Sequence, residues 1–137
     1  MAVTVAAWLA NGREENEWDY VLSHIKPDAR FVMGKHACTH NVLRDAPVVS
    51  TAADLPNDPL VLVVPLSARN FTPDTALQDF THPTDAVYMF GPNSEHITED
   101  DMGGRVPDHI VYIPTDTKDE MFNYVACIVT LWHRRYG

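Results

Sequence analysis

The sequence predicts an α/β fold in which a mostly parallel sheet is flanked by helices. Short apolar segments alternate along the chain with segments whose apolar residues recur at helical spacing. Residues 60–64 are continuously apolar between Pro59 and Pro65, which is typical of a central strand covered on both faces of a parallel sheet. Strands that alternate with helices in this way indicate an α/β fold.

Six segments are short, apolar and bounded by turn-forming residues, and we expect them to be strands. They comprise residues 3–9, 29–33, 48–50, 59–65, 86–90 and 109–113. The connection 67–83 is long and polar. A loop of this length in a compact domain is usually functional.

Helices are expected between these strands. Residues 14–25 carry apolar side chains at the i, i+3, i+4, i+7 spacing of one helix face. Residues 51–55 suit a short helical turn, and Thr98 and Asp101 have the spacing of a capping box ahead of a short helix.

A longer helix is predicted at the C-terminus. Thr117 and Glu120 have capping-box spacing at its start. Apolar side chains then recur at helical spacing from Met121 to Trp132. Residues 133–135 are basic and lie at the helix end, where cations meet the negative pole of the dipole.

Length and charge limit the function. The chain has 137 residues, which suits a single domain spanning 1–137, and its formal net charge is −9. Proteins that hold nucleic acid mainly by neutralising phosphates are usually basic. RNA binding would therefore need a local basic patch or a site completed by a partner subunit, and binding to a membrane surface is disfavoured.

The cysteines and the N-terminus favour a soluble, cytoplasmic protein. Cys38 and Cys127 lie far apart and form no CxxC pair, so we expect reduced thiols, with Cys127 buried in the last helix. No positive charge precedes the apolar N-terminal stretch, which is interpreted as a strand. The apolar run 60–66 is too short to cross a bilayer.

Common catalytic motifs are absent, and one metal-ligand pattern has two interpretations. The sequence contains neither a Gly-x-Ser-x-Gly elbow nor a Gly-rich phosphate loop. His36, Cys38 and His40 alternate, and on a strand they would face one side as three metal ligands. The alternative, which we favour, is an ordinary polar loop without metal.

Three separated elements in the second half of the chain match a family pattern in order and spacing. Phe90-Gly91-Pro92 ends an apolar strand, Ile113-Pro114-Thr115 ends the next, and Met121-Phe122-Asn123 opens the last helix, with Asn123 ten positions after Ile113. Singly, the first is an ordinary strand-ending turn and Asn123 an ordinary helix-surface residue. As an ordered set, from Phe80 to Tyr136, they resemble the C-terminal half of the SpoU branch of the SPOUT methyltransferases.

The resemblance implies a fold, a cofactor and a substrate class. The fold is an α/β domain whose C-terminal segment is threaded into a trefoil knot. The family binds S-adenosyl-L-methionine in the knot, usually as a homodimer. It typically methylates a ribose 2′-hydroxyl of tRNA or rRNA, so an RNA substrate is expected, with no membrane partner and no metal.

The resemblance also implies a set of site residues. Gly91 would approach the methionine part of the cofactor, and the backbone of Ile113, Pro114 and Thr115 would hold the adenine. Phe122 and Asn123 would close the pocket, and the turn at Pro65 and Leu66 would form the first knot loop. Phe90 and Asn93 complete the cofactor-binding set, and Arg13 and Asn123 are the catalytic candidates.

Departures from the family pattern keep a second function open. Asn93 stands where the family has a glutamate, and Met121 where it has a serine. The family motif Asn-x-Gly-Asn-x-x-Arg is missing. Asn11-Gly12-Arg13 occupies its region with different spacing, so Arg13 is either the catalytic cation or a solvated helix charge. The alternatives to an RNA methyltransferase are a non-catalytic knot dimer that binds cofactor or RNA, and a doubly wound domain for another small ligand.

Overall fold

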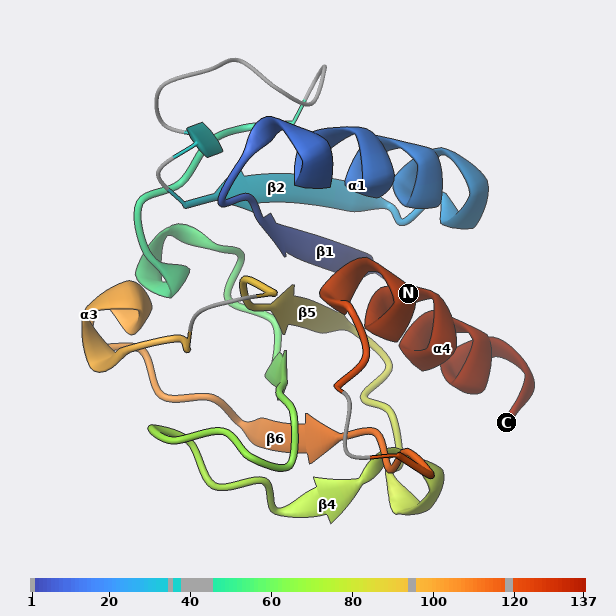
Figure 1. Ribbon diagram of the computed structural model, residues 1–137. Coiled ribbons are helices and arrows are strands. Elements are labelled where there is room, and N and C mark those ends of the chain that lie inside the picture. The colour runs from blue at the N-terminus through green and yellow to red at the C-terminus, as the bar shows by residue number, and fades with distance from the viewer. Residues whose placement is uncertain (1, 35, 38–45, 94–95, 118–119) are drawn as a thin grey trace.

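A computed structural model describes residues 2–34, 36–37, 46–93, 96–117 and 120–137. Six strands form one sheet in the order β2-β1-β5-β3-β6-β4, and every pairing is parallel (Figure 1). The strands are β1 (Val3–Trp8), β2 (Ala29–Met33), β3 (Leu60–Val63), β4 (Thr75–Ala76), β5 (Ala86–Phe90) and β6 (His109–Tyr112). The predicted α/β fold with a parallel sheet is confirmed. Its strands therefore all present their carboxyl ends at one edge.

The two faces of the sheet are covered by different elements. The long helices α1 (Gly12–Ile25) and α4 (Asn123–Tyr136) pack against one face, and α3 (Glu99–Met102) and the 3₁₀ helix η1 (Ala52–Asp54) cover the other (Figure 1). A second 3₁₀ helix, η2, spans Leu77–Asp79. Among the described residues, no helix is long and apolar enough to cross a membrane.

Strand β5 lies at the centre of both cores. Its residues Tyr88 and Phe90 pack in the α1–α4 core, and the alternate residues Val87 and Met89 pack in the opposite core. Strand β3, beside it, is buried along its whole length. Burial on both faces explains why residues 60–64 are continuously apolar, as expected for a central parallel strand.

Helices α1 and α3 begin at side-chain caps. The Asn11 Oδ1 atom accepts hydrogen bonds from the backbone N–H groups of Arg13 and Glu14, so α1 begins two residues before the expected position. Its end is marked by Lys26 in the left-handed conformation, with φ 52°. The capping box predicted at α3 is confirmed, because the Asp101 carboxylate accepts from the Thr98 N–H at 2.7 Å.

Two expectations about strands were wrong. Residues 48–50 make a single bridge, Val32 to Val48, in place of a strand. The preceding residue, Pro47, has no N–H with which to extend a ladder. The connection 67–83, expected to lack regular structure, contains β4 and η2. A two-residue edge strand is too short to produce a periodic pattern in the sequence.

The capping box predicted from Thr117 and Glu120 was also wrong, whereas the helix opening expected at Met121-Phe122-Asn123 is confirmed. Helix α4 begins at Asn123 with Phe122 as its N-cap residue, and residues 113–117 are not helical. Glu120 hydrogen-bonds to Ser67 on another loop instead of completing a capping box with Thr117. The basic residues 133–135 do lie in the last turn, as predicted.

A hydrogen-bonded chain of polar side chains joins α4 to β5. Arg134 Nη1 donates to the Tyr88 hydroxyl oxygen at 2.8 Å, and that hydroxyl lies 2.7 Å from His82 Nδ1. The other ring nitrogen of His82, Nε2, lies 2.7 Å from His133 Nδ1. A neutral His82 donates a hydrogen bond from one ring nitrogen and accepts one at the other, so it can bond to both neighbours. Burial, with His133 and Arg134 nearby, lowers the pKa of His82 from 6.5 to about 4.

This chain predicts an acid-sensitive fold. Between pH 6.5 and 4 the unfolded chain binds a proton at His82 that the folded chain excludes, so stability falls as the pH falls through this window. After allowance for partial exposure, we expect His82 to account for a loss of about 1–2 kcal/mol. Urea unfolding at several pH values measures this change in the free energy of unfolding. His82→Gln should flatten the slope, and an unchanged slope in that variant would contradict the assignment.

Candidate functional site

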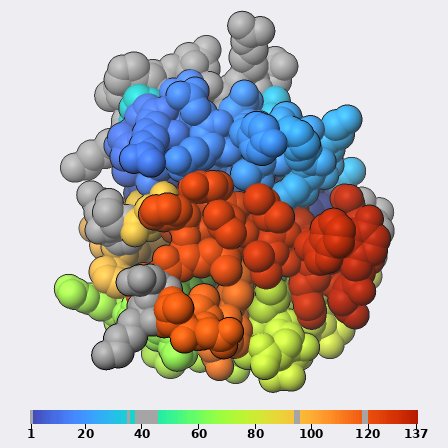
Figure 2. All heavy atoms as spheres, turned by 45° about the vertical axis from the view of Figure 1, so that its right-hand side comes forward, coloured from blue at the N-terminus to red at the C-terminus, as the bar shows by residue number. Residues whose placement is uncertain are grey.

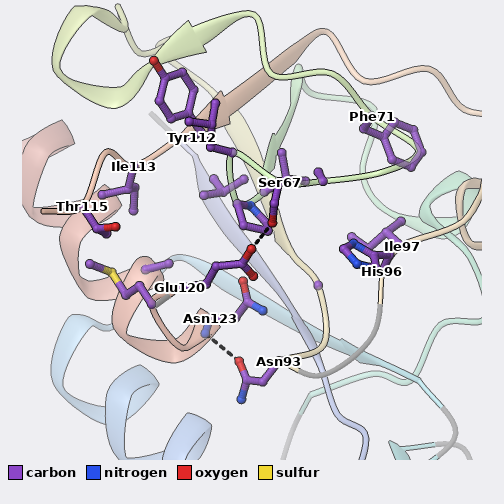
Figure 3. A pocket seen from close by; sticks show the side chains of 18 of the residues that line it. Ser67, Phe71, Asn93, His96, Ile97, Tyr112, Ile113, Thr115, Glu120 and Asn123 are labelled. Atoms are coloured by element: carbon purple, nitrogen blue, oxygen red, sulfur yellow. Dashed lines mark hydrogen bonds between the residues drawn. The ribbon is translucent and has the colours of Figure 1, made fainter. Parts of the chain in front are cut away.

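A pocket of about 670 Å³ opens at the carboxyl ends of β3, β5 and β6. Three segments line it: residues 63–71 after β3, residues 91–93 with 96–97 after β5, and residues 112–115 with Glu120, Met121 and Asn123 after β6 (Figure 3). Ligands of open parallel sheets sit beyond the carboxyl ends of the strands. The location, the size and the mixed lining therefore suit a small organic ligand.

Most residues expected at the site lie in this pocket. The structure brings together eight of the candidates from three distant parts of the chain. They are Pro65, Leu66, Gly91, Asn93, Ile113, Pro114, Thr115 and Asn123.

Gly91 provides space beside the pocket wall. A Cβ atom at this position would lie 2.8 Å from Cγ1 of Ile97, a buried residue that also lines the pocket. The φ angle of Gly91 is outside the left-handed region, so a side chain here would be crowded without straining the backbone. Glycine thus lets Ile97 pack against the chain where β5 ends.

Asn93 and Asn123 connect two walls of the pocket. The Asn93 side-chain oxygen accepts a hydrogen bond from the backbone N–H of Asn123 at 2.7 Å (Figure 3). The side-chain nitrogen of Asn123, Nδ2, donates to the Pro92 carbonyl at 3.0 Å. The first bond satisfies a backbone donor at the start of α4, where Phe122 supplies no side-chain cap. The Asn123 side chain is buried and holds α4 against the turn after β5.

Two further hydrogen bonds connect the loop after β3 to the other two loops that line the pocket. The Ser67 hydroxyl donates to the Glu120 carboxylate, which joins the loop after β3 to the segment before α4 (Figure 3). Asn70 Nδ2 donates to the Ile97 carbonyl at 2.9 Å. All three loops around the pocket are therefore linked by side chains.

Three candidate residues lie outside the pocket lining. Phe90 is buried in the α1–α4 core, with its ring 5.7 Å from that of Trp18. Phe122 is 55% exposed and its ring stacks on Tyr124. Arg13 projects into solvent from α1, with 87% of its side chain exposed, and its Nε lies 3.5 Å from a carboxylate oxygen of Glu17.

The sequence analysis did not assign several pocket residues. Among them are Arg69, Phe71, His96, Ile97 and Tyr112. The length of the 67–83 connection was a signal that its residues serve a site, and its first residues do line the pocket. His96 and Ile97 had no comparable signal, because they follow the strand-ending turn without a motif of their own.

Most of the proposed metal ligands lie outside the described residues. Cys38 and His40 lie outside the described residues, and His36 Nε2 lies 3.2 Å from a Glu15 carboxylate oxygen. No cluster of three metal-binding side chains occurs in the described part of the chain. Cys127 is buried as expected, and burial raises the pKa of its thiol.

Known structures share this fold. TrmJ from Z. mobilis ZM4 superposes with a TM-score of 0.71 at 15% identity, over 99% of this chain and 68% of the other. An AdoMet-bound rRNA methyltransferase from Sinorhizobium meliloti gives 0.66 at 10% identity, over 98% of this chain and 56% of the other. A structure that gives insights into the 2-OH methylation of C/U34 on tRNA superposes with a TM-score of 0.63 at 15% identity, over 98% of this chain and 94% of the other.

The chain has the same fold as these three structures. No protein-family model and no curated protein matches the sequence itself. The chain spans about two thirds of the Z. mobilis structure and just over half of the S. meliloti one. At these identities the likeness concerns the fold, and the chemistry must be argued from the pocket.

The contact between Asn93 and α4 predicts a graded effect on stability. Asn93→Ala removes the acceptor for the Asn123 N–H and should cost about 1 kcal/mol, as the loss of a helix cap does. Asn93→Asp keeps an acceptor and adds a negative charge at the helix N-terminus, so it should be at least as stable as the unmodified protein. Chemical denaturation tests both variants. Equal stability of all three proteins would show that the contact does not stabilise α4.

Proposed function

We propose that this protein is an S-adenosyl-L-methionine-dependent RNA methyltransferase that modifies a ribose 2′-hydroxyl of tRNA or rRNA. The observation that carries the proposal is the pocket at the carboxyl ends of β3, β5 and β6. It is lined by most of the residues in which the sequence resembles the SpoU branch, Phe90 and Phe122 excepted. The similar structures include an AdoMet-bound rRNA methyltransferase and one that gives insights into the 2-OH methylation of C/U34 on tRNA, and they support the same reaction class.

The pocket residues fit the proposed cofactor. The pocket volume of about 670 Å³ is within the range of small-ligand sites, roughly 300–1,000 Å³. Apolar walls from Phe71, Ile97 and Ile113 suit the adenine ring of the cofactor, and the side-chain amide of Asn93 suits its polar parts. When bound, S-adenosylmethionine supplies a methyl group on a positively charged sulfur.

The chain's own residues would bind and orient this cofactor. We assign contacts along its length to Gly91 and to residues 113–115, with Pro65 and Leu66 forming the opposite wall. Asn93 and Asn123 keep the walls together through the start of α4. Phe90 is buried next to Gly91 in the chain, and the exposed Phe122 lies in the chain between the lining residues Met121 and Asn123. Transfer would then depend chiefly on holding the ribose hydroxyl in line with the methyl group.

Arg13 is the proposed cation for the ribose hydroxyl or the adjacent phosphate. It is exposed and lies outside the pocket lining of its own chain. We therefore propose that it acts on a pocket completed by a second copy. In such a complex an RNA phosphate would compete with the Glu17 carboxylate for the guanidinium group.

We also propose a knotted, single-domain homodimer that acts in the cytoplasm. The segment before α4 hydrogen-bonds to the loop after β3 and to the turn after β5, which supports threading of the C-terminus between them. Helices α1 and α4 lie side by side on one face of the molecule (Figure 2). Together they expose Tyr20, Ile128, Trp132 and Tyr136, large side chains that suit a subunit interface.

One alternative is a non-catalytic knot dimer that binds cofactor or RNA. The net charge of −9 and the pairing of Arg13 with Glu17 favour it, because both weaken contact with RNA phosphates. The two functions differ in transfer of a labelled methyl group to RNA. Only the enzyme releases S-adenosylhomocysteine.

The cofactor proposal predicts a thermal shift. S-adenosylhomocysteine should raise the melting temperature by mass action, since it would bind only the folded chain. Gly91→Val should abolish the shift, because its side chain would press Ile97 into the pocket. The variant should remain folded with a stability loss of about 1–3 kcal/mol from crowding.

Arg13→Ala separates binding from transfer. The variant should keep the shift with S-adenosylhomocysteine, because Arg13 does not line the pocket. It should lose methyl transfer to total tRNA or rRNA. Absence of any shift in the unmodified protein at millimolar S-adenosylhomocysteine would contradict the cofactor assignment, and unchanged transfer in Arg13→Ala would contradict the role of Arg13.

The dimer proposal predicts a change in mass upon surface substitution. Light scattering of the unmodified protein at micromolar concentration should give twice the chain mass of 15.4 kDa. Replacing exposed Trp132 and Ile128 by glutamate should give monomers without unfolding, because neither side chain is in the buried core. A monomeric unmodified protein would rule the dimer out. A double variant that is still fully dimeric would show that the interface does not include Trp132 and Ile128.

A further inference from the structure

Glu120 gives the pocket a distinctive charge. Among the described residues that line it, Glu120 is the only carboxylate and Arg69 the only lysine or arginine. The carboxylate of Glu120 lies between Ser67 and Asn123 and projects toward the middle of the pocket (Figure 3). A ligand bound here would therefore meet one negative charge on the segment that leads into α4.

The present partner of this carboxylate is a neutral hydroxyl. Ser67 donates to Glu120 from the loop after β3, across the pocket from the segment before α4. Glu120 is exposed to water in the absence of a ligand, so this bond is weak in net free energy. A ligand that covers the pocket would exclude this water, and a positive group on it would then interact more strongly with the carboxylate than the hydroxyl does.

We propose that Glu120 selects the ligand by its positive charge. The Ser67 hydroxyl is exchanged for a cationic group when the ligand enters. The inference rests on the proposed function, in which the cation is the sulfonium or the α-ammonium group of S-adenosylmethionine. Glu120 is then a specificity-determining residue of the pocket, and its role was hidden in the sequence by its apparent capping-box spacing with Thr117.

The test compares three ligands by calorimetry. S-adenosylmethionine carries both cationic groups, S-adenosylhomocysteine carries only the ammonium, and 5′-methylthioadenosine carries neither. Glu120→Gln keeps the shape of the side chain and removes its charge. The affinity for a charged ligand should fall by about tenfold or more, the loss expected for one charge-assisted hydrogen bond. It should leave the affinity for 5′-methylthioadenosine unchanged.

A matched control and a partner variant sharpen the result. Glu99→Gln makes the same chemical change on α3, outside the pocket lining, and should alter none of the three affinities. Ser67→Ala frees the carboxylate from its present partner and should strengthen the binding of charged ligands. If the Ser67–Glu120 hydrogen bond only held the two segments together, both variants would change the affinity for charged ligands in the same direction.

Each outcome has a definite meaning. A loss confined to S-adenosylmethionine assigns Glu120 to the sulfonium, and an equal loss for both charged ligands assigns it to the ammonium. Unchanged affinities, or an equal loss for all three ligands, would overturn the charge-selection role while leaving the cofactor proposal intact. Failure of the unmodified protein to bind any of the three would overturn both.

Discussion

The attachment of α4 to the turn after β5 is the contact on which the pocket depends. The Asn123 backbone and side chain hydrogen-bond to Asn93 and to the Pro92 carbonyl, and the Asn123 side chain is buried. Without these bonds, residues 120–122, which lead into α4, would lose their link to the turn after β5. The pocket wall that they form could then move away from Gly91, although Glu120 would still be bonded to Ser67 on the loop after β3.

Other parts of the molecule hold α4 in the same position. Its C-terminal half is connected to β5 through Arg134, Tyr88 and His82, and its apolar face packs beside α1. Burial raises the pKa of Tyr88, so its hydroxyl stays protonated. The start of α4 is thus attached to the turn after β5, and its C-terminal half to Tyr88 in the middle of the strand. The helix position, and with it the pocket geometry, follows from a single central strand.

The sequence predicted the regular part of this structure well because burial leaves a periodic signal. The bounds of β2 and β5 agree with expectation, and the capping box at Thr98 is present. The capping pattern at Thr117 predicted too early a start for α4, because the helix begins at Asn123, where long-range contacts hold it. Local spacing carries no information about a partner such as Asn93, thirty positions away.

The site could be predicted where it coincides with strand ends and not beyond them. Gly91, residues 113–115 and Asn123 all line the pocket, since each follows directly from a strand or begins a helix. Phe90 and Phe122 were expected there too. The alternation of β5 directs Phe90 into the core, and Phe122 remains exposed at the N-cap of α4. Glu120 and His96 come from irregular segments whose placement depends on the whole fold.

The proposed function requires a cofactor-sized ligand at the carboxyl end of the sheet. A second cavity, of about 530 Å³, lies at the amino end and is lined by Lys26, Thr84 and Arg135. Titration of ¹⁵N-labelled protein with S-adenosylhomocysteine distinguishes the two cavities. We expect shifted amide resonances at Gly91, Ile113 and Asn123, with those of Lys26 and Thr84 unchanged. Shifts confined to the amino end, or none at saturating ligand, would contradict the proposed function.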